Sequence, residues 1–180
     1  MISLYNEVIV SVRHNKVNKL TLCALLTALM FVLGYIENML PTAALMGIPG
    51  VKIGLSNGVL LFALYMLNVP TAFVLMVVKV TLASLTFASP SSLPFALAGG
   101  VLSLCAMAPL SKIKGMHLVT VSIVGAVCHN VGQVLMAMWV MQTEELVYYM
   151  AVLMLIGIAS GALTGIVATS VIKHMKVIKK

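Results

Sequence analysis

Acidic residues are scarce in this chain of 180 residues, which contains no aspartate. Its four acidic residues are Glu7, Glu37, Glu144 and Glu145. A magnesium site built from clustered aspartates is therefore excluded, together with any mechanism that depends on one. The chain also lacks a GxxxxGK[ST] phosphate-binding loop, so it cannot hydrolyse ATP by that route.

Cysteine is also scarce, and its pattern excludes two common structural devices. Cys23, Cys105 and Cys128 are odd in number and fall within apolar runs, which supports neither a disulfide framework nor a zinc site with paired spacing. We interpret them as small buried apolar side chains. The 11 basic residues are not interleaved with aromatic residues along a polar face. We therefore expect no metal, no cofactor and no nucleic-acid partner.

Apolar residues dominate what remains. They make up 62% of the chain, charged residues make up only 8%, and the mean hydropathy is +1.14, far outside the range of soluble domains. About 20 apolar residues cross a bilayer as a helix, because backbone polar groups in lipid must bond within the segment. The sequence predicts an all-α integral membrane protein with six transmembrane helices, roughly over residues 20–35, 51–67, 70–88, 92–110, 116–141 and 146–172.

Basic residues orient these helices. With six spans, nine basic residues fall on one side of the membrane, namely Arg13, Lys16, Lys19, Lys112, Lys114, Lys173, Lys176, Lys179 and Lys180. The positive-inside rule then places both termini in the cytoplasm of a cell-membrane protein. We expect a basic segment at residues 1–19, a single membrane domain at 20–172 and a basic tail at 173–180.

Lys79 lies near the middle of the third predicted helix. A charged side chain at that depth costs at least about 2.5 kcal/mol, so we expect it to face the bundle interior or a wet cavity. It either binds a ligand or forms a structural ion pair with a glutamate such as Glu37.

The stretch GAVCHNVGQ, residues 125–133, brings polar residues into the fifth helix. At about 100° per residue, Gln133 lies about 40° from His129, and Asn130 lies about 100° from it. Gly125 and Gly132 flank this face and leave space beside it. The group forms the wall of a pocket or, alternatively, hydrogen-bonds a neighbouring helix.

Further polar residues lie near the outer ends of the first two helices. Glu37 and Asn38 follow the first span, and Lys52 and Asn57 belong to the second. None of the polar candidates falls in the inner half of the membrane. This asymmetry predicts an outward-facing cavity for an anionic or polar small molecule. Because no nucleophile, base and orienting group form a set, we predict a binding protein rather than an enzyme.

Two patterns of small residues suggest close helix contacts. Ala24 and Ala28 are four residues apart in the first helix, and Gly157, Gly161 and Gly165 form two consecutive GxxxG units in the last. For the glycines we favour packing within the bundle over packing against another subunit.

Four segments, GYIENMLP, IPGVKIGLSNGVLLFALYML, LPFALAGGVLSLCAMAPL and GAVCHNVGQVLMA, resemble the Gx transporter family, also labelled heptaprenyl diphosphate synthase component I. The resemblance covers roughly residues 20–170. This family is similar to the S components of energy-coupling factor (ECF) vitamin transporters. The resemblance implies six helices, an outward ligand pocket and a first-helix alanine motif that meets a membrane coupling subunit driven by two ATPases.

Residue by residue, Ala24 and Ala28 match the spacing of that alanine motif. The residues that match the family's own patterns are Lys52, Asn57, His129, Asn130 and Gln133, and Lys79 stands where the family carries a basic residue. The family implies no single substrate, although a quinone precursor or a flavin-like compound suits its relatives.

The leading interpretation is an S-component-like, substrate-binding subunit of a small-molecule or vitamin-type importer. The alternative is a noncatalytic membrane accessory protein in isoprenoid or quinone metabolism or in extracellular electron transfer. Prenyl diphosphate condensation itself requires magnesium held by clustered aspartates, which this chain lacks. A third possibility, a proton-coupled carrier with Glu37, Lys79 and His129 as a relay, ranks last because no internal repeat is evident.

Overall fold

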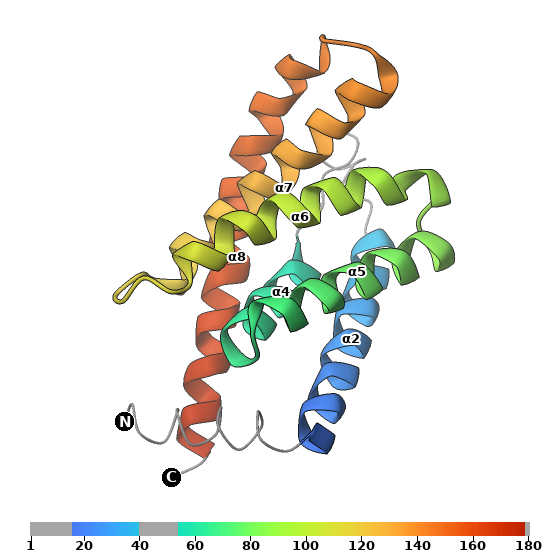
Figure 1. Ribbon diagram of the computed structural model, residues 1–180. Coiled ribbons are helices and arrows are strands. Elements are labelled where there is room, and N and C mark those ends of the chain that lie inside the picture. Colours follow the sequence, from blue (N-terminus) through green and yellow to red (C-terminus); the bar gives the residue numbers. More distant parts are fainter. Residues whose placement is uncertain (1–15, 40–53, 179–180) are drawn as a thin grey trace.

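The computed structural model describes residues 16–39 and 54–178, and within them it contains only helices and turns. Figure 1 shows their arrangement. The α-helices are α2 (Lys16–Met39), α4 (Leu55–Met66), α5 (Val69–Thr86), α6 (Leu93–Leu110), α7 (Leu118–Met141) and α8 (Leu146–Ile178), with a short 3-10 helix η1 (Pro90–Ser92) before α6. The predicted all-α membrane bundle is confirmed.

Local sequence explains where several helices begin. The Asn68 side chain accepts a hydrogen bond of 2.9 Å from the backbone N–H of Thr71 and so caps α5, and Pro70 occupies its first turn. Pro90 is likewise the first residue of η1. Gly115 adopts φ 89° in the turn between α6 and α7, a conformation that favours glycine. The gaps between the predicted segments at residues 68–69, 89–91 and 111–115 therefore coincide with real helix ends.

Within residues 16–39 and 54–178, five helices are long and apolar enough to cross a membrane. The exception is α4, whose 12 residues rise only about 18 Å, short of a hydrocarbon core of about 30 Å. The second span was expected to begin near residue 51, but in the described part of the chain its helix begins at Leu55, after Gly54 with φ 81°. The protein is thus a multi-pass membrane protein, and the described part of the chain includes one short apolar helix.

The short helix α4 lies at the centre of the packing. It contacts α2, α5, α7 and α8, and Leu61 on α4 is among the largest fully buried side chains, with Met30 of α2, Met76 of α5 and Val121 of α7. Many large apolar side chains on the outer faces of the helices stay exposed, as expected for surfaces that meet lipid.

Glycines bring the last three helices into close contact. A Cβ atom added to Gly161 of α8 would lie 2.7 Å from the Cα of Ile123 on α7, and one added to Gly165 would lie 2.8 Å from the Cα of Val119. A Cβ atom added to Gly132 of α7 would lie 2.9 Å from the Cα of Gly99 on α6. The GxxxG face of α8 therefore contacts α7 of the same chain.

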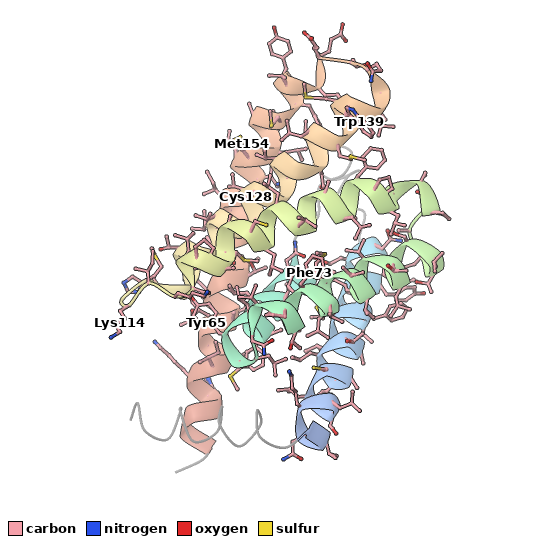
Figure 2. All side chains as sticks on the ribbon, viewed as in Figure 1. Tyr65, Phe73, Lys114, Cys128, Trp139 and Met154 are labelled. Atoms are coloured by element: carbon pink, nitrogen blue, oxygen red, sulfur yellow. The ribbon has the colours of Figure 1, made fainter. Side chains whose placement is uncertain are left out.

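The two ends of the bundle differ. The first residues of α2 and the last turns of α8 lie toward one end, and the turn between α7 and α8 lies at the other (Figure 1). Figure 2 places Lys114 in the turn between α6 and α7, and Trp139 near the opposite end of α7. A basic residue at one end of this helix and an aromatic residue at the other suit a membrane-crossing orientation.

Candidate functional site

A cavity of about 420 Å³ lies among the helices, and α2, α4, α5, α6, α7 and α8 all contribute residues to its wall. This volume falls within the usual range of small-molecule sites, about 300–1,000 Å³. Six of the eight residues predicted to bind substrate line it: Glu37, Asn57, Lys79, His129, Asn130 and Gln133. These residues come from four helices, α2, α4, α5 and α7, and the fold brings them to one space.

Glu37, near the end of α2, is buried with 6% of its surface exposed. Its Oε1 accepts a hydrogen bond of 2.6 Å from the backbone N–H of Leu55, and its Oε2 accepts one of 3.2 Å from Ser56 Oγ. The N-cap of α4, Gly54, has no side chain to satisfy these first N–H groups. The Glu37 carboxylate therefore caps α4 from another helix, where the helix dipole also favours a negative charge.

Lys79 and Asn57 form the next polar contact. The Nζ of Lys79 on α5 donates a hydrogen bond of 2.7 Å to Oδ1 of Asn57 in the first turn of α4. Both side chains are partly buried and line the cavity. A cationic side chain thus stands on the cavity wall, near the middle of a helix long and apolar enough to cross a membrane, and an amide oxygen holds it in place.

The polar face of α7 is divided between two neighbouring helices. A Cβ atom added to Gly99 of α6 would lie 3.1 Å from His129 Nδ1 and 2.8 Å from Gln133 Cγ, so both side chains pass close to α6. Asn130 instead turns toward α8, where its Nδ2 donates a hydrogen bond of 2.7 Å to the Leu153 carbonyl oxygen. All three line the cavity.

The two remaining predicted substrate residues are not placed at the cavity. Asn38 is exposed, and its Nδ2 donates a hydrogen bond of 3.1 Å to the carbonyl oxygen of Phe87, which ties the end of α2 to the end of α5. Lys52 lies outside the described residues.

Several lining residues were not anticipated from the sequence. Buried hydroxyl groups extend the cavity between α6, α7 and α8, with Ser122 Oγ and Thr164 Oγ1 hydrogen-bonded at 3.0 Å. Phe31 and Phe87, whose ring centroids lie 5.4 Å apart, add an aromatic wall, and Phe95 lines the cavity as well. Serines in membrane helices commonly bond their own backbone, so the sequence pattern did not single them out.

Ala24 and Ala28 lie on the exposed face of α2, whereas Leu26 and Met30 of the same helix are buried. The alanine pair therefore faces away from the packed core.

The cysteines are not all buried. Cys23 and Cys128 are partly buried, but Cys105 is exposed on α6, so its interpretation as a buried apolar side chain was wrong. Among residues 16–39 and 54–178, no three His, Cys, Asp or Glu side chains are grouped to hold a metal ion.

Comparison with known proteins places the chain in a family. The sequence profile described as heptaprenyl diphosphate synthase component I matches residues 26–171, which include part or all of every helix that lines the cavity. No curated protein and no solved structure matches the chain. Because the match extends over most of the sequence, the chain belongs to the heptaprenyl diphosphate synthase component I family.

Proposed function

We propose that this protein is the substrate-binding, S-component-like subunit of a small-molecule importer, and that it captures an anionic or polar ligand from the outer side of the membrane. The observation that supports this role is the convergence of Glu37, Asn57, Lys79, His129, Asn130 and Gln133 on one cavity of about 420 Å³. Polar residues are expensive in a membrane and usually mark a pathway or a binding site.

The side chains on the cavity wall favour an anion. Lys79 brings a positive charge, and the imidazole ring of His129 can donate a hydrogen bond. The carboxylate of Glu37 receives two hydrogen bonds at the start of α4, where its charge supports the fold. A quinone precursor or a flavin-like compound with an acidic group has this chemistry.

Import also requires an energy source and a partner. The sequence has no GxxxxGK[ST] loop, so we propose that a membrane coupling subunit with two ATPases supplies the energy. The exposed alanines Ala24 and Ala28 would let a partner helix approach α2 closely. The basic residues orient the protein in the cell membrane with both termini in the cytoplasm.

Purification from native membranes, followed by native mass spectrometry, tests the capture role. The wild-type protein is expected to retain a small molecule, and His129→Ala is expected to lose most of it while remaining folded. His117→Ala, an exposed histidine at the N-cap of α7, is the matched control and should retain the molecule. The role is wrong if no small molecule accompanies the wild-type protein.

The family description favours one second candidate, a noncatalytic accessory protein in isoprenoid or quinone metabolism or in extracellular electron transfer. In that case the polar residues would support the fold or a partner rather than bind cargo. Co-purification separates the two: a prenyltransferase or redox subunit without an ATPase module supports the second candidate.

A further inference from the structure

Tyr149, in the first turns of α8, lines the same cavity and carries a buried hydroxyl oxygen. Within the described part of the chain this oxygen has no hydrogen-bond partner. Buried tyrosine hydroxyls nearly always have one, because burial removes the water that would otherwise bond them. A hydroxyl without a partner beside a cavity therefore suggests that a ligand supplies the bond.

Two amide side chains lie on the facing helix. The ring of Tyr149 packs against the pair Val134 and Leu153, and the Leu153 carbonyl accepts the hydrogen bond from Asn130. Gln133 is one helical turn from Asn130, in the direction of the turn between α7 and α8, and Tyr149 is one turn from Leu153 in the same direction. Asn130 and Gln133 therefore lie level with Leu153 and Tyr149 along the two helices, and Asn130, Gln133 and Tyr149 all line the part of the cavity toward the turn between α7 and α8.

Both amides retain hydrogen-bonding capacity. Asn130 uses only its Nδ2 donor, toward Leu153, and no hydrogen bond joins the Gln133 side chain to any residue described in the structure. An amide oxygen accepts a hydrogen bond, whereas a phenolic hydroxyl can donate one. The three side chains thus offer donors and acceptors without net charge.

We propose that Tyr149, Gln133 and Asn130 form a neutral subsite that binds an uncharged edge with adjacent carbonyl and N–H groups, while the acidic group of the same ligand lies toward Lys79. Tyr149 donates to the ligand carbonyl, and an amide oxygen accepts from the ligand N–H. The aromatic rings of Phe31, Phe87 and Phe95 on the cavity wall suit a planar ring. The ligand class is a planar heteroaromatic acid, and this assignment rests on the proposed capture function.

Three planar bicyclic probes test the subsite by direct binding to the purified protein. Pterin carboxylate carries both the carbonyl and N–H edge and an acidic group, pterin carries only the edge, and naphthoate carries only the acid. Pterin carboxylate is expected to bind about tenfold more tightly than either of the others.

Tyr149→Phe is expected to weaken pterin carboxylate and pterin about three- to tenfold and to leave naphthoate unchanged, since it removes one neutral hydrogen bond. Lys79→Met should weaken pterin carboxylate and naphthoate but not pterin. Tyr148→Phe is the matched control, because that neighbouring tyrosine is 83% exposed, and it should change none of the three affinities.

Thermal unfolding separates binding from a structural role. Tyr149→Phe removes an oxygen that bonds no described residue, so the unfolding midpoint of the free protein should stay the same or rise. A lower midpoint, or an equal loss of affinity for all three probes, overturns the subsite. If no probe binds but a native small molecule still co-purifies, the ligand class is wrong and capture stands. If neither occurs, both proposals fail.

Discussion

Lys79 Nζ on α5 donates a hydrogen bond of 2.7 Å to Asn57 Oδ1, one residue after Ser56, which donates to Glu37 of α2. The first turn of α4 therefore joins two longer helices through polar contacts at the cavity wall. A helix too short to cross the bilayer thus organises the charged groups of the site.

Lys79→Met should weaken retention of an anionic ligand by about ten- to a hundredfold, because a hydrogen bond to a charged group is worth about 1.5–3 kcal/mol. Native mass spectrometry and a binding titration with the co-purified molecule measure the loss. Lys114→Met, in the exposed turn between α6 and α7, is the control and should bind normally. Undiminished binding together with a lower unfolding midpoint would show that Lys79 is structural.

Glu37→Ala should lower the free energy of unfolding by about 2–4 kcal/mol, because it leaves the Leu55 N–H and the Ser56 hydroxyl without their acceptor. Glu37→Gln keeps one acceptor oxygen and should lose about half as much. Thermal unfolding in detergent compares both with Met39→Ala, an exposed neighbour at the end of α2. Equal stability of the three variants would contradict the capping role of Glu37.

Gly161→Ala should destabilise the α7–α8 pair by about 1–3 kcal/mol, the usual effect of overpacking. The new Cβ would lie 2.7 Å from the Cα of Ile123, a backbone atom that cannot rotate away. Alanine favours helix over glycine by only about 1 kcal/mol, so the overlap decides the sign. Ala159→Leu, on the exposed face of α8, is the control for thermal unfolding. An unfolding midpoint at or above the wild-type value would contradict the close contact.

Replacing both Ala24 and Ala28 with leucine should leave the unfolding midpoint of the isolated protein unchanged, because both positions are exposed on α2. The same change should abolish co-purification with an ATPase module, since the larger side chains hold a partner helix away. The control replaces Ala151 and Ala159, exposed on α8, with leucine. Equal loss of the complex in both double variants would argue against a specific α2 interface.

The sequence predicted the fold more completely than the site. The apolar runs and the gaps between them at residues 68–69, 89–91 and 111–115 located the helices, because lipid forces each segment to satisfy its own backbone. In the described part of the chain α4 begins only at Leu55, and hydropathy does not reveal the left-handed Gly54 that precedes it.

For the site, the sequence alone identified which polar residues were too costly to face lipid, and six of them line one cavity. Only the tertiary structure could decide what each one contacts. Glu37 caps α4, Asn38 bonds the Phe87 carbonyl oxygen and does not line the cavity, and Tyr149 leaves its hydroxyl without a described partner. The physical reason is that membrane depth follows from a residue's position along one helix, whereas a hydrogen-bond partner depends on how separate helices pack.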